Sequence, residues 1–394
     1  MNKAILNKEV QDFINSNLKS DISKLIFKGS PFNYVSIQEI AEQIEAKGKC
    51  KKKLPTWFSI KNIYFPNKLN IEQTSSEITA KYKANLVSGD SLIDITGGFG
   101  VDAYYFSQNV KNITHCEINS DLSEIANHNL KSLNIKNIKT YIGNGLNYLQ
   151  KKSIKFDWIY ADPSRRNDIK GKVFLLKDCL PNIPENLDLL FTKTYNVLLK
   201  LSPILDIKSA TQELNFVKDI HVVAVENEVK ELIFILEKNH TENIHIQTVN
   251  FIKNDTQKFN FDFNTHYLPT YSEPKTYLYE PNAAILKSGG FNQISAKLKI
   301  DKLHQHSHLY TSENLKDFPG RRFKIKHCIP YNKKLLKKYI PSSKANISTR
   351  NFPETVTQIR KKTKIKDGGS IYVFFTTDLN NKHIVLICEK VKIH

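Results

Sequence analysis

The chain has 394 residues, too many for one ordinary domain, and its 40% hydrophobic and 25% charged composition is typical of a folded globular protein. No apolar run approaches the roughly 18 residues of a membrane-spanning helix, and the N-terminus lacks the apolar core of a signal peptide. Five widely separated cysteines without CxxC spacing argue against a disulfide scaffold or a zinc site. We therefore expect a cytoplasmic protein with no membrane segment.

The formal net charge of +19 is concentrated near the C-terminal end of the chain. Only six of the 58 basic residues are arginines, and diffuse lysine of this kind is typical of an AT-rich genome. Residues 321–366, however, carry 15 lysines or arginines and a single acid, which is the clustering expected of a nucleic-acid-binding surface. The pairs Arg165–Arg166 and Arg321–Arg322 add guanidinium forks that suit phosphate.

Two kinds of apolar pattern divide the first 240 residues. Residues 1–85 are predicted to be mostly helical, because apolar residues recur there every three or four positions. In residues 86–240 short apolar runs alternate with helical stretches, which predicts βαβ units and a parallel sheet with an antiparallel hairpin at its end. The expected strands are 91–96, 112–118, 138–143, 156–162, 196–203, 220–226 and 231–238.

The remainder of the chain is predicted to hold two smaller parts. Residues 241–320 show only weak strand signals and are expected to form a small accessory region. From residue 321 to residue 394 strands and helices alternate, which predicts a small α+β domain that carries the basic cluster. His304, His306 and His308 alternate along the chain without a patterned acid or cysteine, so we expect them to be solvated and no metal to be bound.

A glycine-rich segment, DITGGFG, lies directly between a predicted strand and a predicted helix. Glycines there let the backbone turn tightly and approach a ligand, and the free N–H groups at the helix start can bind it. A structural turn without a ligand is the alternative. The residues of this segment that we expect to contact a ligand are Asp94, Thr96, Gly97, Gly98 and Gly100.

Polar residues follow the next three predicted strands. Glu117 ends the second strand, where a carboxylate accepts hydrogen bonds from a ribose diol, and Asn144 follows the third, where an amide suits an adenine edge. Asp162 and Pro163 end the fourth strand, at the rim where open α/β sheets bind ligands. An exposed strand-end acid for Glu117 and a turn cap for Asp162 remain the structural alternatives.

Taken together, these features resemble an S-adenosylmethionine-dependent methyltransferase. The DITGGFGVD segment is similar to the cofactor loop of bacterial ribosomal guanine-N2 methyltransferases, and the likeness covers roughly residues 70–240. The helical start, SSEITAKYKA, DPSRR, KLSPILD and the basic α+β end resemble the bacterial methyltransferases with a THUMP-like C-terminal domain. The resemblance implies a Rossmann-like class I methyltransferase sheet, with a helical N-terminal region and a small α+β C-terminal domain.

The resemblance also implies roles for individual residues. S-adenosyl-L-methionine is the implied cofactor, with Asp94 and the glycine segment at its methionine end, Glu117 at the ribose and Asn144 near the adenine. Many amino-group methyltransferases carry Asp/Asn-Pro-Pro-aromatic at the rim, whereas here a serine and an arginine follow the first proline. The hydrogen-bond acceptor is therefore retained and the stacking ring is not. The implied catalytic group is Asp162, Pro163, Ser164 and Arg165.

The basic cluster and the retained hydrogen-bond acceptor favour structured RNA (rRNA or tRNA) as the substrate, methylated on an exocyclic base nitrogen. The residues expected to contact RNA are Arg165, Arg166, Arg321, Arg322, Lys361 and Lys362. Two alternatives stay open: an RNA-binding protein with a degenerate methyltransferase fold, and a methyltransferase that acts on a small molecule or a protein. Pyrimidine-C5 chemistry is disfavoured because it needs a cysteine nucleophile, and none lies in the segment after the fifth strand.

Overall fold

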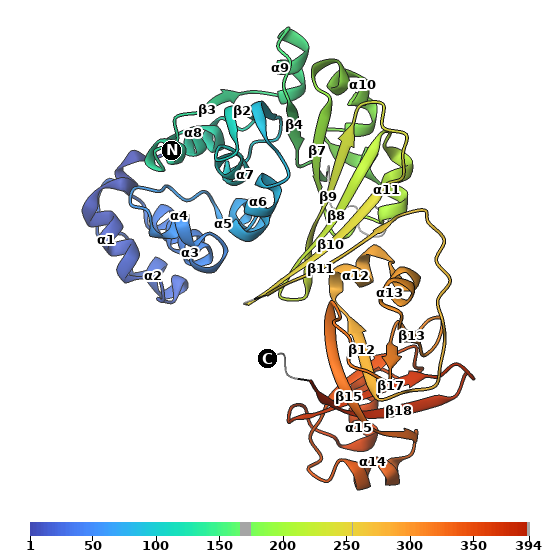
Figure 1. The fold of residues 1–394 in the computed structure, drawn as a ribbon. Helices are drawn as coiled ribbons and strands as arrows, with labels where there is room; N and C mark the ends of the chain where they lie inside the picture. Colours follow the sequence, from blue (N-terminus) through green and yellow to red (C-terminus); the bar gives the residue numbers. More distant parts are fainter. Residues whose placement is uncertain (166–174, 254, 392–394) are drawn as a thin grey trace. The chain divides into compact units, whose positions relative to one another are not determined.

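The computed structural model describes residues 1–165, 175–253 and 255–391. It divides into two compact units, one of Met1–Ile220 with Lys230–Glu242 and one of His221–Val229 with Asn243–His394 (Figure 1). Arg166, one of the predicted RNA contacts, lies outside the described residues.

The first unit begins with short helices, as the apolar periodicity predicts. The longest of them starts at a capping box, in which Ser36 Oγ accepts from the Glu39 backbone N–H and the Glu39 carboxylate accepts from the Ser36 N–H. Buried isoleucines and valines from several of these helices form one core cluster. The elements are η1 Lys3–Leu6, α1 Lys8–Ser16, α2 Ile22–Lys28, α3 Ile37–Lys53, α4 Pro55–Ser59, α5 Lys68–Gln73 and α6 Glu77–Ala84.

The larger sheet has the strand order β11-β10-β8-β9-β7-β4-β1-β2-β3. Five neighbouring strands of this sheet are parallel, namely β3, β2, β1, β4 and β7. Strand β9 runs antiparallel beside β7. This order confirms the predicted Rossmann-like methyltransferase sheet. The strands are β1 Gly89–Asp94, β2 Val110–Glu117, β3 Ile138–Ile142, β4 Trp158–Ala161, β7 Asn196–Leu201, β8 Val217–Val225, β9 Glu228–Glu237, β10 His245–Ile252 and β11 Asp255–Asp262.

Helices connect the parallel strands, so all five strands point their carboxyl ends toward one edge of the sheet. The buried apolar side chains of β1, β4 and β7 fill the core between sheet and helices. A short antiparallel ladder, β5 Ser164–Arg165 with β6 Cys179–Leu180, follows β4. The connecting elements are α7 Val101–Phe106, α8 Ser120–Ser132, α9 Gly145–Lys151, η2 Leu176–Asp178, α10 Ile183–Lys193 and α11 Ile207–Glu213.

The second unit contains a sheet with the order β13-β14-β12-β15-β18-β17-β16, shown in orange and red in Figure 1. Strand β12 belongs to the predicted accessory region and pairs with β15, which begins at the predicted boundary and continues into the basic α+β part. The two predicted parts therefore share one sheet. The three predicted boundaries between the four parts of the chain stay predictions. The elements are β12 Tyr277–Pro281, α12 Ala283–Ser288, α13 Phe291–Leu298, β13 Asp301–Lys302, β14 Tyr310–Ser312, β15 Gly320–Pro330, α14 Lys333–Tyr339, β16 Asn346–Arg350, α15 Val356–Thr363, β17 Ile371–Thr377 and β18 His383–Lys390.

Within the described ranges, the structure contains no helix with the length and apolar character needed to cross a bilayer.

Candidate active site

A cavity of about 1140 Å³ lies in the first unit, at the carboxyl edge of the parallel strands. Its volume is at the upper end of that of ligand pockets, which run to about 1,000 Å³. Most of the predicted cofactor and catalytic residues line it, whereas Gly100 is not among its lining residues. The predicted residues that it brings together are Asp94, Thr96, Gly97, Gly98, Glu117, Asn144, Asp162, Pro163 and Ser164.

The glycine-rich segment packs tightly against β2. The Gly97 N–H donates to the Cys116 carbonyl at 2.8 Å, and a Cβ at Gly97 would lie 2.5 Å from His115 Cε1. Gly98 and Gly100 adopt positive φ angles of 60° and 82°, which side chains disfavour. The turn therefore needs glycine both for its backbone conformation and for its close approach to the neighbouring strand.

We expect Gly97→Ala to lower the free energy of unfolding by about 1–3 kcal/mol, because the new methyl group overpacks a closed site. Gly48→Ala in α3 is the matched control, since no atom lies within 4 Å of its added Cβ, and it should stabilise the helix by up to about 1 kcal/mol. Urea denaturation followed by tryptophan fluorescence measures both, because the two tryptophans, Trp57 and Trp158, lie in the first unit. Equal effects of the two substitutions would show that the turn tolerates a side chain.

Glu117 is held in place by backbone N–H groups. Its Oε2 accepts from Gly98 N and its Oε1 accepts from Asn119 N, each at 2.7 Å, and the residue is 8% exposed. Each carboxylate oxygen retains lone-pair capacity for a hydroxyl of a ligand. Asn144 is the N-cap of α9, with its side-chain oxygen accepting from Asn147 N at 3.1 Å. Its side-chain NH₂ group is thus the part that stays available to a ligand.

Asp94 and Asp162 are connected through Thr96. Asp94 Oδ1 accepts from the Thr96 N–H at 2.9 Å and from its hydroxyl at 3.2 Å, and the same hydroxyl accepts from Asp162 N at 2.7 Å. Burial raises the pKa of the Asp94 carboxyl well above its ordinary value, and the hydrogen bonds from Thr96 oppose this shift. The ends of β1 and β4 are thereby fixed to each other at the cavity.

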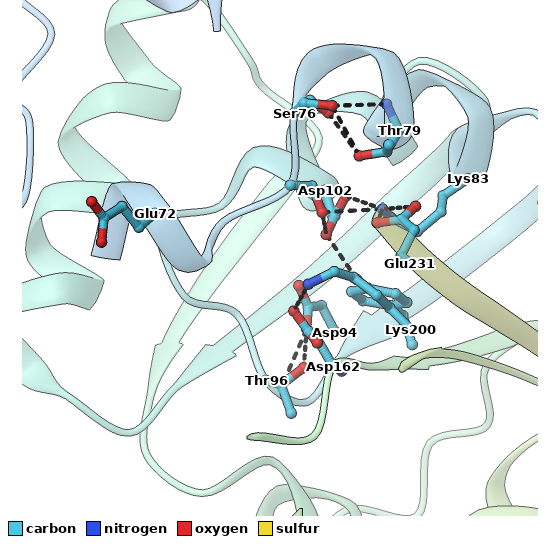
Figure 2. A network of polar contacts seen from close by, with 12 residues as sticks. Glu72, Ser76, Thr79, Lys83, Asp94, Thr96, Asp102, Asp162, Lys200 and Glu231 are labelled. Atoms are coloured by element: carbon cyan, nitrogen blue, oxygen red, sulfur yellow. Dashed lines mark hydrogen bonds and ion pairs between the residues drawn. The ribbon is translucent and has the colours of Figure 1, made fainter. Parts of the chain in front are cut away.

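An ion pair at the rim was absent from the sequence-based prediction. Lys200, on β7, donates from Nζ to Asp162 Oδ2, and both residues line the cavity (Figure 2). Burial lowers the pKa of Lys200, but the carboxylates of Asp162, Glu231 and Asp102 raise it by more, so the ammonium stays charged. Lys200 is therefore a fixed cation beside the predicted catalytic carboxylate.

A second buried cation lies in the same network. Lys83 of α6 is fully buried and contacts both Glu231 oxygens at 2.8 and 2.9 Å, and its Nζ lies 3.2 Å from Asp102 Oδ1 (Figure 2). Asp102 also accepts from Ser75 Oγ at 2.8 Å and from the Tyr160 hydroxyl at 2.7 Å. The network ties α6, α7, β4 and β9 together beneath the cavity.

The sequence contained a signal for this network. Thr79, Ala80, Lys83 and Ala84 are all buried on one face of α6, so the lysine occupies a position of the apolar stripe. Glu231 opens the apolar run of β9 and is 2% exposed. The N-terminal region also supplies part of the cavity wall, through Asn70, Gln73, Thr74 and Ser75.

The remaining rim residues have simpler environments. Pro163 is buried and Ser164 is exposed on β5. The backbone of Arg165 pairs with Cys179 in the short ladder.

In the second unit, the predicted RNA contacts divide into paired arginines and exposed lysines. Arg321 donates from Nε to Glu280 Oε2 at 2.6 Å, and Arg350 donates to the other oxygen at 3.0 Å. Arg322 lies 3.4 Å from Asp317. Lys361 and Lys362 are exposed on α15, the latter 3.0 Å from Glu354. The arginines thus have carboxylate partners within their own unit.

His115 gives the first unit a defined acid sensitivity. It is fully buried beneath the glycine-rich segment, and burial lowers its pKa to about 4. Between pH 6.5 and 4 the unfolded chain binds a proton here that the folded chain does not, so stability is lost as the pH falls. We expect about 2 kcal/mol of this loss between pH 7 and pH 5. Urea denaturation at both pH values, compared with His115→Gln, measures it, and an identical pH dependence in the variant would contradict it.

Among the described residues, no group of three or more His, Cys, Asp or Glu side chains is arranged to hold a metal ion. The expectation that these histidines are solvated is wrong for His304, which is buried and contacts Asn381 at 3.0 Å and Asn351 at 2.9 Å. The ring of the half-buried His308 stacks on Phe291 at 3.6 Å.

Two family models match the second unit, a ferredoxin-like domain over residues 277–319 and a THUMP domain-like model over residues 320–390. No curated protein matches the chain. Among solved structures, the chain is similar to a candidate methyltransferase from Porphyromonas gingivalis W83, with 30% sequence identity, a TM-score of 0.88 and 99% of both chains covered.

Two other solved structures match a smaller part of the chain. An rRNA methylase from Streptococcus thermophilus has 13% identity and a TM-score of 0.30, with 42% of this chain and 98% of that chain covered. TrmK of M. capricolum, solved with S-adenosyl-homocysteine, has 17% identity and a TM-score of 0.31, with 41% of this chain and 68% of that chain covered.

The identity to the P. gingivalis protein extends over nearly the full length of both chains. The sheet order and the THUMP-like match agree with it. The chain belongs to the same family as that protein, the bacterial class I S-adenosylmethionine-dependent methyltransferases with a THUMP-like C-terminal domain.

Proposed function

We propose that the protein uses S-adenosyl-L-methionine to methylate an exocyclic amine of a base in structured RNA. The observation that carries this proposal is the composition of one cavity. The glycine turn after β1 and the buried Glu117 at the end of β2 line the same cavity as the Asp162 carboxylate after β4. A site for a nucleoside-bearing cofactor thus lies beside a hydrogen-bond acceptor for an amine.

The residues of the cavity fit the cofactor. Glu117, Asn144 and Asp94 line the cavity together, so that Glu117 would accept from the ribose hydroxyls, Asn144 would contact the adenine and Asp94 would bind the methionine end. When bound, the cofactor supplies a methyl group on a positively charged sulfur. Because burial raises the pKa of Asp94, and because a ligand ammonium favours the ionised carboxylate, cofactor affinity should increase with pH through the titration of this group.

The rim residues suit an amine acceptor. Asp162 Oδ2 is occupied by Lys200, so Oδ1 is the atom that accepts a hydrogen bond from the amine. This bond would point the nitrogen lone pair toward the methyl carbon. The bound cofactor would supply the methyl group and leave as the neutral thioether, and the proton released from the amine nitrogen would go to solvent. Catalysis of this kind is mainly positioning, which contributes through effective concentration.

The second unit supports RNA as the acceptor. Lysines 333, 334, 337 and 338 are all exposed on α14, and Lys361 and Lys362 are exposed on α15. Lysine contacts to phosphate release counterions, so binding should weaken steeply with salt. Phosphate contacts position a substrate without reading its sequence, and the target base is then selected at the cavity.

The test is transfer of a labelled methyl group from S-adenosylmethionine into total RNA from cells that lack the protein. Label that ribonuclease releases and protease does not release would support the proposal. Protease-sensitive label or label in small molecules would favour the alternative acceptors. Cofactor-independent RNA binding without transfer would favour a degenerate methyltransferase fold.

The contribution of α14 is tested by reversing its four lysines to glutamate. Lys8, Lys19, Lys24 and Lys28, which are exposed on or beside α1 and α2, provide a control with the same change of charge. We expect the α14 variant to raise KM for RNA at least about tenfold, a loss of about 1.4 kcal/mol of binding. The control variant should leave KM close to that of the unaltered protein, and equal effects would contradict a specific role for α14.

A further inference from the structure

We propose that Lys200 is a specificity residue of the acceptor site, where its ammonium donates a hydrogen bond to the ring nitrogen beside the methylated amine. The same ammonium also donates a hydrogen bond to Asp162, so that the donor Lys200 and the acceptor Asp162 lie next to each other at the base. This inference rests on the proposed function and deepens it, because it specifies which edge of a base the cavity accepts.

The hydrogen bonds of Lys200 leave it with spare donors. An ammonium has three N–H donors, and Asp162 Oδ2 is the acceptor that Nζ reaches within the described parts of the chain. The side chain is 14% exposed and lines the cavity. Buried donors without a partner cost free energy, so a ligand atom that accepts from Lys200 is favoured at this position.

Among the described residues, Lys200 contacts the carboxylate of Asp162 and acts on the deeper carboxylates of Asp102 and Glu231 through its charge alone. Lys83 already contacts both oxygens of Glu231 and lies 3.2 Å from Asp102. Figure 2 shows the Lys83 cluster and the Lys200–Asp162 pair as adjacent groups, the second of them next to Thr96 and Asp94. The deep cluster thus has its own cation, and Lys200 is the cation of this network that lines the cavity, as Lys230 of β9 also does.

Asp162 and Lys200 form a matched pair of acceptor and donor. Asp162 is 34% exposed, and its Oδ1 accepts none of the hydrogen bonds found among the described residues. On the Watson–Crick edge of adenine and cytosine the exocyclic amine lies beside a ring nitrogen that accepts, whereas in guanine the accepting ring nitrogen lies on the other side of the amine, and uracil has no exocyclic amine. Enzymes that modify a flipped base commonly read it by hydrogen bonds along this edge.

The charge of Lys200 determines what it can do there. Three carboxylates hold the ammonium in its protonated form, so it donates hydrogen bonds and does not act as a base. It is therefore a positioning residue. Its removal should affect turnover with RNA while the cofactor end of the cavity, formed by Glu117 and the glycine turn, is left intact.

The experiment compares Lys200→Met, which keeps the aliphatic stem, with Lys200→Arg, which keeps charge and donors. Lys111→Met is the matched control, because Lys111 forms an exposed pair with Asp90 at 2.6 Å outside the cavity. Each protein is titrated with S-adenosylmethionine by calorimetry. Then kcat and KM are measured for methyl transfer into total RNA from cells lacking the protein, and the labelled nucleoside is identified.

We expect Lys200→Met to lower kcat/KM at least about 100-fold, as for the loss of a positioned donor, while cofactor affinity changes less than about threefold. The kcat/KM of Lys200→Arg should be at least about tenfold higher than that of Lys200→Met. The label should lie on adenosine, cytidine or guanosine.

Lys200→Met activity equal to that of Lys111→Met would overturn the proposal, as would parallel losses of cofactor binding and turnover. Label on uridine would overturn the predicted edge while leaving RNA methylation standing. If the unaltered protein bound the cofactor but methylated no RNA, the proposed function itself would fail, and with it the base contact of Lys200.

Discussion

Asp162→Asn is expected to lower the rate of methyl transfer by about 10²–10³-fold, the cost of losing one positioned electrostatic contact at the reacting atoms. The substitution removes the negative charge that pairs with Lys200 but keeps the shape of the side chain. The backbone N–H of residue 162 would still donate to Thr96 Oγ1, so the rim keeps its anchor to β1. Single-turnover kinetics at saturating cofactor measure the effect on the chemical step.

Asp188→Asn provides the control for this experiment, because Asp188 is exposed on α10 and does not line the cavity. Cofactor affinity, measured by calorimetry, should be close to that of the unaltered protein in both variants. Transfer by Asp162→Asn as fast as transfer by Asp188→Asn would remove Asp162 from the acceptor site.

Lys83→Met is expected to lower the free energy of unfolding by about 3–5 kcal/mol, the typical cost of leaving buried charges without a partner. Glu231 is 2% exposed and would lose the ammonium that contacts both of its oxygens. Asp102 would keep the hydroxyl donors of Ser75 and Tyr160, so Glu231 should account for most of the loss. Urea denaturation followed by the fluorescence of Trp57 and Trp158 measures the effect in the first unit.

The double variant Lys83→Met with Glu231→Leu isolates the ion pair. Replacing a buried pair by apolar residues of similar volume is often neutral, so the double variant should recover most of the stability lost by the single one. If Lys83→Met lowered the free energy of unfolding by less than about 1 kcal/mol, the network would be contradicted, because a loss that small is typical of an exposed salt bridge.

The features that could be predicted from sequence were those encoded locally. Each parallel strand is a short apolar run followed by a helix, and the residues that define the cavity come directly after such runs. DITGGFG after β1, Glu117 at the end of β2 and Asp162 after β4 could therefore be placed at one edge. The hairpin of β8 and β9 followed in the same way from its short turn.

The features that sequence reasoning missed depend on long-range pairing. Lys83 and Glu231 are 148 residues apart, and nothing in either local pattern specifies the other as its partner. Arg321 was predicted to contact RNA, and its local sequence does not identify Glu280, 41 residues earlier, as the carboxylate that meets it across the β12–β15 ladder. Strands β10 and β11 were also indistinct in sequence, because polar residues interrupt both of them.

The account depends most directly on the cavity at the carboxyl edge being the cofactor site. Calorimetric titration of the full-length protein with S-adenosylmethionine tests this without any assumption about the acceptor. We expect one site per chain, with an affinity that falls at least about tenfold in Glu117→Ala, a change of about 1.4 kcal/mol. No heat of binding by the unaltered protein, or equal affinity in the Glu117→Ala variant, would contradict the account.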